Sequence, residues 1–199
     1  ENMKTFIFDC LSAAFFTCFL QNIIFTGGFG ITETVRMAAK PSNLFKSGAF
    51  VTLFSVSVTL LSRWADGIPA IKDSGKIVHA IVFSVILALV YTAALIAARL
   101  MKASALTQRR MSVCALNTLV LSLPYIVYSS SFSTAQAFGA ALGASCAYVA
   151  ATVLIHAGIH RIKQNESIPP AFSSNGALFI YTAILCLAFS GIAGERIVL

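Results

Sequence analysis

Long stretches with at most one charged residue alternate with short polar segments along the whole chain. Each apolar stretch has about the twenty residues that a helix needs to cross a bilayer. A helix satisfies its own backbone hydrogen bonds in lipid, so each stretch is predicted to be a transmembrane helix. The connections are too short for a soluble domain, which predicts a single all-α membrane domain over residues 1–199. The six stretches are 5–24, 44–62, 78–98, 111–131, 135–159 and 176–193.

Composition supports the same environment. Hydrophobic residues make up 58% of the chain and charged residues only 11%, with a mean hydropathy of +0.85. A soluble domain keeps about a quarter of its residues charged. The lipid bilayer is therefore the predicted surroundings. The net charge of +7 does not indicate nucleic-acid binding, because the Lys and Arg residues gather in the connections, where they set membrane topology.

The connections carry unequal numbers of positive charges when they are assigned alternately to the two sides of the membrane. One side receives nine Lys and Arg residues and the other five, which predicts both termini on the non-cytoplasmic side. The nine are Arg36, Lys40, Lys46, Arg99, Lys102, Arg109, Arg110, Arg161 and Lys163, and the five are Lys4, Arg63, Lys72, Lys76 and Arg196.

Six spans divide into two sets of three, roughly 1–100 and 105–199, and an odd number of spans per set inverts the second set. The first span of each set contains an asparagine, Asn22 or Asn117, followed by residues that weaken a helix. We therefore predict two inverted repeats whose first helices are broken near the membrane midplane, where they frame a cavity. The alternative is that GGFGITET is an ordinary loop. The weakening residues are Gly27, Gly28 and Gly30 in one set, and Ser122, Pro124 and the serines at 129–131 in the other.

The fifth span has small residues every four positions along one face, which predicts close contact with another helix. They are Gly139, Gly143, Ala147 and Ala151.

Some polar and sulfur-containing residues inside the spans could carry chemistry. His156 and His160 share a helical face, but no third metal ligand accompanies them, which favours a solvated or capping role. Asp9 is an intramembrane carboxylate near the entrance of the first span, where it can also reach the interface. The cysteines show no metal-ligand spacing, so they are interpreted as small packing residues. They are Cys10, Cys18, Cys114, Cys146 and Cys186.

The C-terminal segment SIPPAFSSNGALFIYTAILCLAFSGIAG, residues 167–194, carries a family resemblance. It resembles the final loop and helix of the integral membrane subunits of the Rnf electron transport complex and of the Na⁺-translocating NADH:quinone oxidoreductase. The similarity is greatest to the A subunit of the Rnf complex. The matching residues are Pro169, Phe172, Ser174, Asn175, Leu187, Ala188, Phe189, Gly191 and Gly194.

The resemblance extends to both broken helices. Gly30 falls on the glycine of the family's F-L-G-L-C-P pattern, and residues 116–122 fall on its T-N-C-A-V-L-G pattern. The family's two cysteines hold a 2Fe-2S cluster together with a paralogous partner subunit. Thr32 and Thr118 occupy these cysteine positions here, and a neutral hydroxyl is a poor iron ligand. The resemblance therefore implies the family fold with the cluster abandoned or altered.

The implied function is that of a non-catalytic membrane subunit in a redox-driven Na⁺ or H⁺ pump of the bacterial inner membrane. Its partners would be the paralogous subunit and the other subunits of the complex, and the cavity could hold a hard cation such as Na⁺. A stand-alone transporter for a small solute or ion and a cluster-less scaffold subunit are the alternatives. No nucleophile–base pair, phosphate-binding loop or metal motif is visible. The candidate site comprises Asn22, Gly27, Gly28, Gly30, Thr32, Asn117 and Thr118.

Overall fold

The computed structural model describes residues 3–164 and 175–193, and these are almost entirely helical, without a strand. Six helical segments are long and apolar enough to cross a membrane, which confirms the predicted multi-pass all-α architecture. The residues of the C-terminal motif at 167–174 and Gly194 lie outside the described part of the chain. The six segments are Met3–Leu20, Pro41–Asp66, Lys76–Leu100, Ala105–Ser129, Thr134–Gln164 and Gly176–Ala193.

Each segment is built from one or more helices, some of them short. The first half of the chain contains α1 (Met3–Phe15), the π-helical turn η1 (Phe16–Leu20), α2 (Ile23–Gly27), α3 (Ile31–Ala39), the 3₁₀ turn η2 (Pro41–Asn43), α4 (Leu44–Asp66), α5 (Pro69–Lys72) and α6 (Lys76–Leu100). The second half contains α7 (Ala105–Ala115), α8 (Thr118–Ser129), α9 (Thr134–Gln164) and α10 (Asn175–Ala193).

The first span of each half is interrupted, as predicted, but the positions of the breaks differ in part. In the first half the helix breaks at Gln21–Asn22 and again at Gly28–Gly30. GGFGITET is not a simple loop, because α3 begins within it at Ile31. In the second half the break lies at Leu116–Asn117, and the predicted helix breaker Pro124 is buried inside α8. Packed neighbours allow a membrane helix to tolerate such a proline, whereas the asparagine starts a new helix.

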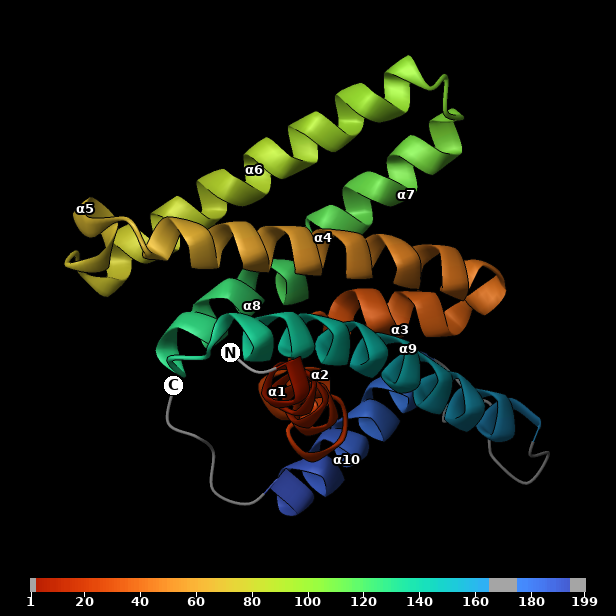
Figure 1. Cartoon of the computed structure of the whole chain (residues 1–199). Helices are drawn as coiled ribbons and strands as arrows, with labels where there is room; N and C mark the ends of the chain where they lie inside the picture. Colours follow the sequence, from red (N-terminus) through yellow and green to blue (C-terminus); the bar gives the residue numbers. More distant parts are fainter. Residues whose placement is uncertain (1–2, 165–174, 194–199) are drawn as a thin grey trace.

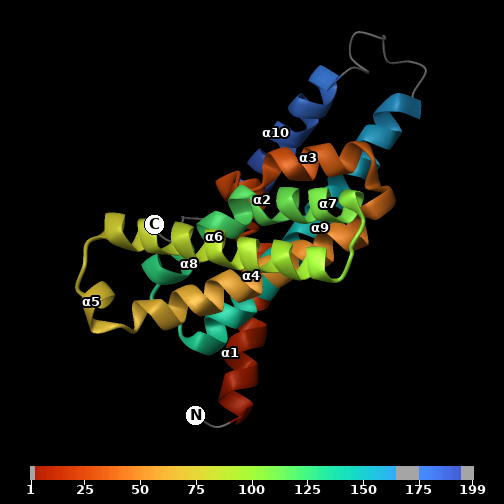
Figure 2. The same cartoon turned by 90° about the horizontal axis from the view of Figure 1, so that it is seen from above.

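Helices α4 and α9 form the centre of the bundle and pack against each other (Figures 1 and 2). The broken segments α1, η1 and α3 of the first half pack on α9, and the broken segments α7 and α8 of the second half pack on α4. Each half therefore lays its interrupted helix on the central helix of the other half. This exchange is what an inverted repeat would produce, although the repeat itself stays a prediction.

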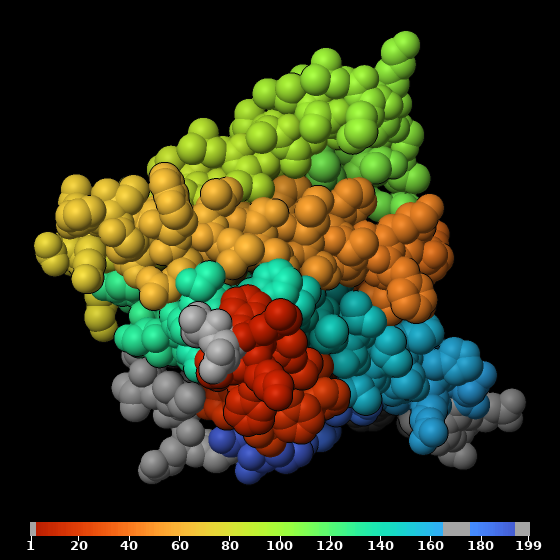
Figure 3. Space-filling model, in the orientation of Figure 1, coloured from red at the N-terminus to blue at the C-terminus, as the bar shows by residue number. Residues whose placement is uncertain are grey.

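The small-residue face of α9 contacts α1, which lies across it at the front of the molecule (Figure 3). A methyl group on Gly139 would overlap the carbonyl of Cys10, and one on Gly143 would overlap Ala14 and the hydroxyl of Thr17. The predicted close helix contact is confirmed, and only a residue without a side chain fits at these two positions.

The connections gather at two opposite ends of the bundle. The α3–α4 and α6–α7 connections lie at one end together with the C-terminal end of α9, whereas α5 and the α8–α9 connection lie at the other (Figure 1). A hydrogen bond from Arg63 Nε to the carbonyl of Phe132, 3.1 Å long, joins α4 to the α8–α9 connection at this second end. Helices that cross a membrane in alternating directions place every second connection on the same side. The connections of this structure are grouped in that way.

Candidate functional site at the helix breaks

The turn between α2 and α3 is built from two glycines in the left-handed conformation. Gly28 ends α2 with φ of 73°, and its N–H donates to the carbonyl of Ile24 at 3.0 Å. Gly30 precedes α3 with φ of 78°. A side chain in this conformation costs about 1–2 kcal/mol, so the glycines allow the tight turn between α2 and α3 inside the bundle.

The two asparagines begin the helices that follow the breaks. Asn22 Oδ1 accepts from the N–H groups of Ile24 and Phe25, at 3.2 and 3.3 Å, and its Nδ2 donates to the carbonyl of Cys18. Asn117 Oδ1 accepts from the N–H of Leu119 at 3.1 Å. Each side chain satisfies backbone groups that a helix start leaves unpaired. Asn22 lines none of the three cavities described below, so its role in the structure is to join η1 to α2.

The break of the first half touches the break of the second half directly. The N–H of Gly30 donates to Thr118 Oγ1 at 2.8 Å, across 88 residues of sequence. A methyl group at Gly30 would lie 2.9 Å from Asn117 Oδ1 and 3.0 Å from Leu119 Cβ. The close approach therefore requires glycine for its lack of volume as well as for its conformation.

A cavity of about 390 Å³ lies beside this contact, between the end of α7 and the first turns of α3 and α8. Thr32 and Thr118 both line it, although they belong to different halves of the chain. Glu33 adds a carboxylate, which pairs with Arg36 at 2.7 Å. Asn117 Nδ2 is buried and has no hydrogen-bond partner in the described structure. The lining residues are Gly30, Thr32, Glu33, Ser112, Val113, Leu116, Asn117 and Thr118.

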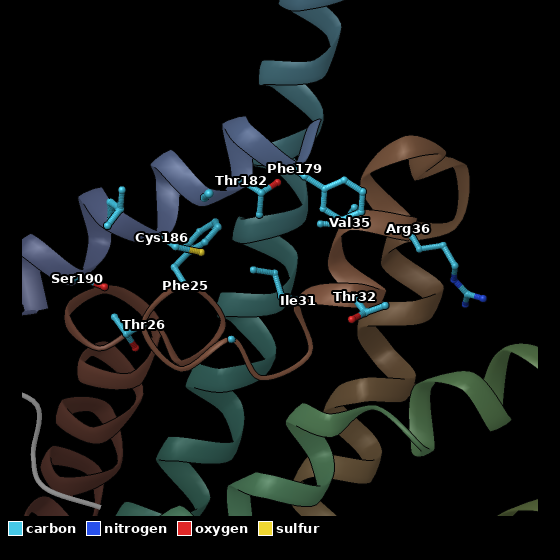
Figure 4. Close-up of a pocket in the computed structure, with 13 residues that line it drawn as sticks. Phe25, Thr26, Ile31, Thr32, Val35, Arg36, Phe179, Thr182, Cys186 and Ser190 are labelled. Carbon is cyan, nitrogen blue, oxygen red and sulfur yellow. The ribbon is translucent and has the colours of Figure 1, made fainter. Parts of the chain in front are cut away.

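Two larger grooves flank the place where the Gly28–Gly30 turn contacts Asn117 and Thr118, which is called the crossing of the breaks below. One, of about 740 Å³, lies between α2, α3 and α10, where the ring of Phe25 stands beside Cys186 and Arg36 points outward at the rim (Figure 4). The other, of about 600 Å³, lies between the Gly27–Phe29 turn, α6 and α8. Gly28 lines both grooves, and Thr32 and Thr118 each line one of them. The glycine turn thus separates three adjacent spaces.

Six of the seven residues predicted for the site line these cavities, and Glu33 and Ser112 line one of them without having been predicted. Glu33 follows Thr32 directly, and a carboxylate between two threonines just after the glycine turn was the signal available for it. Ser112 has no such signal, because α7 reaches the cavity only through packing. Its hydroxyl lies 2.9 Å from Tyr91 Oη and donates to the carbonyl of Gln108.

No cysteine lines the cavity of about 390 Å³ beside the contact of the two breaks. Cys114 is in the core and Cys18 is in η1, and neither lines any of the three cavities. Cys186 lines the groove along α10. Within residues 3–164 and 175–193, no three His, Cys, Asp or Glu side chains come together as metal ligands would.

His156 contacts the end of another helix, whereas the prediction for the pair of His156 and His160 left a solvated and a capping role open. His156 Nδ1 lies 2.8 Å from the carbonyl of Ala38, next to the last residue of α3. Helix ends leave such carbonyls without an intrahelical partner. His156 therefore ties the end of α3 to α9.

Comparison of the chain with protein-family models and with curated proteins finds no match.

Proposed function

We propose that this protein is a membrane subunit of an electron transport complex of the Rnf and Nqr kind, without iron–sulfur ligands of its own. The observation that carries the proposal is the contact of Gly30 with Thr118 and the cavity that Thr32 and Thr118 share. The sequence resemblance assigns these two threonines to the family's cluster-binding positions. A cluster bridging the two halves requires those positions to be neighbours, and they are, although they are far apart in the sequence.

The proposed subunit works beside a paralogous partner in a bacterial inner membrane, with its termini on the non-cytoplasmic side. The end of the bundle that carries the α3–α4 and α6–α7 connections holds most of the positive charge, which favours the cytoplasm for that end. Helices α6 and α10 are largely exposed. Only 11% of the most apolar part of Lys76–Leu100 is buried, and only 6% of that of Gly176–Ala193. Such surfaces suit lipid or a neighbouring membrane subunit.

Oxygen atoms replace the thiolates of the family in the cavity. The hydroxyl of Thr32 and the carboxylate of Glu33 are ligands that suit a hard cation such as Na⁺ better than iron. Glu33 adds a negative charge at this open site, where it already pairs with Arg36 at 2.7 Å, so a bound cation would share the carboxylate with that guanidinium. We therefore place ion passage rather than electron transfer at this cavity.

The first experiment measures iron and acid-labile sulfide in the anaerobically purified native complex. The proposal expects no cluster ligated by this chain, and about two irons bound to it would contradict the loss of the redox centre.

Restoring the thiolates tests the assignment of the site. Thr32→Cys combined with Thr118→Cys, coexpressed with the partner subunits, should recover a cluster with its visible absorption and about two irons per site. The double Thr→Ser variant is the matched control, because serine keeps the hydroxyls and adds no thiolate. A double-cysteine complex that assembles but binds no more iron than this control would overturn the assignment.

A stand-alone transporter is the second candidate, favoured by the groove of about 740 Å³ next to the helix breaks. Broken helices commonly form the substrate site of transporters. The two functions differ in their dependence on a partner: a transporter is stable and active after purification alone, whereas a complex subunit needs its neighbours. Ion or solute uptake by vesicles that contain only this chain would favour the transporter.

A further inference from the structure

The groove of about 740 Å³ between α2, α3 and α10 combines an apolar interior with a charged end (Figure 4). Arg36 lies at one end of the groove, and Thr26 and Ser190 lie at the other. Arg36 is the only charged residue among the described residues that line it. A long apolar groove with a charge at one end matches the polarity of an amphiphile. The apolar lining residues include Phe25, Ile31, Val35, Phe179, Ala183 and Leu187.

Aromatic packing joins the two walls of the groove. The rings of Phe25 in α2 and Phe189 in α10 stack with their centroids 4.6 Å apart, and Phe25 is buried. Such a pair stabilises the contact beyond the apolar area that it buries. The stacked rings hold α10 against α2, so the groove is part of the packed fold.

Two of the hydroxyl groups in the groove donate within their own helices. Thr26 Oγ1 donates to the carbonyl of Asn22 at 2.9 Å, and Thr182 Oγ1 donates to the carbonyl of Leu178 at 2.8 Å. A hydroxyl has a single proton to donate, so neither group offers a donor to a ligand. The interior of the groove therefore suits a hydrocarbon chain better than a polar solute.

The side of the groove formed by α10 is open. Phe179 and Leu187 line the groove and are 65% and 73% exposed. In a membrane-spanning helix, exposed apolar side chains face acyl chains, which are as apolar as the side chains themselves. A hydrocarbon chain can therefore enter the groove sideways from the bilayer without passing through water.

Arg36 lies near the end of the bundle, at the depth where lipid phosphates are found. Helix α3 ends three residues later at Ala39, and the α3–α4 connection lies at one end of the bundle (Figure 1). The side chain of Arg36 is 60% exposed and points outward at the rim of the groove. A long arginine side chain packs its stem on apolar surface and keeps the guanidinium at the polar boundary.

The ion pair with Glu33 leaves most of the donors of Arg36 for a second anion. Only Nη2 donates to Glu33 Oε1, at 2.7 Å, whereas a guanidinium has five N–H donors. The pair has no net charge, but Lys40 and Lys46 are exposed in the segment that follows, at the same end of the bundle. The end of the groove therefore offers donors within a positively charged region, which is the combination that binds phosphate.

We propose that this groove binds a phospholipid of net negative charge from the surrounding bilayer. One acyl chain lies along α10 between Phe25 and Leu187, and the phosphate accepts hydrogen bonds from Arg36. The groove then holds a resident lipid rather than a transported solute. The proposal does not depend on the assignment of Thr32 and Thr118, because it uses α10 and Arg36 rather than the contact between the two breaks.

The test is quenching of tryptophan fluorescence by brominated phospholipids, with the full chain reconstituted in vesicles. Phe179→Trp places the reporter in the groove, and Trp64→Phe removes the single native tryptophan. Brominated phosphatidylglycerol should bind beside this reporter about fivefold more tightly than brominated phosphatidylcholine, because one basic residue has an effect of this size on an anionic lipid.

Phe15→Trp in the same background is the matched control. Phe15 is 58% exposed in an uncharged part of the first span and does not line the groove, so it reports the lipid that surrounds the protein. Its quenching should show no preference between the two lipids. An equal preference at both reporters would overturn the proposal, and so would a groove reporter that neither lipid quenches.

Substitutions in the ion pair should change the lipid preference in opposite directions. Arg36→Gln should abolish the preference for phosphatidylglycerol at the groove reporter. Glu33→Gln should increase it, because this change removes the carboxylate that competes for the guanidinium. The readout is lipid binding, so it is separate from iron content and from ion transport. A folded Arg36→Gln protein that keeps the preference, or a Glu33→Gln protein that loses it, would contradict the proposal.

Discussion

At the residue scale, the glycine turn is the feature that makes the candidate site possible. Gly28 and Gly30 have almost the same left-handed conformation but different surroundings. A methyl group on Gly28 would meet no atom within 4 Å, whereas one on Gly30 would contact Asn117 and Leu119. A substitution at Gly28 therefore measures the energetic cost of the left-handed backbone conformation alone. A substitution at Gly30 measures that cost together with the cost of steric overlap.

Alanine substitutions at Gly191, Gly28 and Gly30 should destabilise the protein in increasing order. Gly28→Ala should lower the free energy of unfolding by about 1–2 kcal/mol, from the conformation alone. Gly30→Ala should cost about 1–3 kcal/mol more, because the added methyl group overpacks the crossing of the breaks. The measurement is thermal unfolding in detergent with a thiol-reactive dye, which detects exposure of the buried Cys18 and Cys114.

Gly191→Ala in α10 is the control for this series. It has ordinary helical conformation and no atom near the added methyl group, so its effect should stay within about 0.5 kcal/mol. Equal effects of Gly28→Ala and Gly30→Ala would mean that the contact with Asn117 and Leu119 is less tight than the structure shows.

At the scale of elements, the crossing of α1 and α9 depends on direct contact between backbones. Gly139 and Gly143 meet the backbone of α1 and the hydroxyl of Thr17, so no flexible side chain can move away from an added group. Thr17, in η1, also donates its hydroxyl to the carbonyl of Ala13 in the last turn of α1 at 2.8 Å. Close packing of small residues holds this pair together in lipid, where the hydrophobic effect contributes little.

Gly143→Leu should separate α1 from α9 and destabilise the protein by about 3 kcal/mol or more, since overpacking against a backbone has no local relief. The separation should expose Cys18 in η1, which is buried in the native structure, to a membrane-permeant maleimide. Ala157→Leu places the same side chain at an exposed position of α9 and should leave the reactivity of Cys18 unchanged. A protected Cys18 in Gly143→Leu would show that α1 does not need this contact.

At the scale of the whole molecule, two ends with different charge define the orientation in the membrane. The connections that carry Lys72 and Lys102 lie at opposite ends of the bundle (Figure 1). Both side chains are exposed, which makes the pair a matched probe of sidedness.

Lys72→Cys should react with an impermeant maleimide added to intact cells, whereas Lys102→Cys should react only after the cells are opened. The reason is the excess of positive charge at the Lys102 end, which favours retention in the cytoplasm. The parent protein, with its five native cysteines, gives the background labelling. Labelling of Lys102→Cys in intact cells together with protection of Lys72→Cys would reverse the proposed topology.

The sequence by itself determined the features that depend on local composition and spacing. The six membrane spans follow from the length of stretches with at most one charged residue, and a close helix contact on one face of α9 follows from small residues repeated along it, whereas the structure identifies α1 as the partner. Each is encoded within a single segment, because hydropathy and the helical period act on neighbouring residues. The same local reasoning found Asn22 and Asn117 but placed the second weakening of the helix too late, at Pro124, which lies inside α8.

Only the tertiary structure decided what lies next to what. It placed Gly30 against Thr118, put Ser112 of α7 on the cavity and buried His79 beside Asp66, and no local pattern distinguishes these partners. These contacts join segments that belong to different spans. Their geometry follows from how α4 and α9 pack against each other and against the broken helices, which depends on the shapes of whole helix faces rather than on the sequence of any one span.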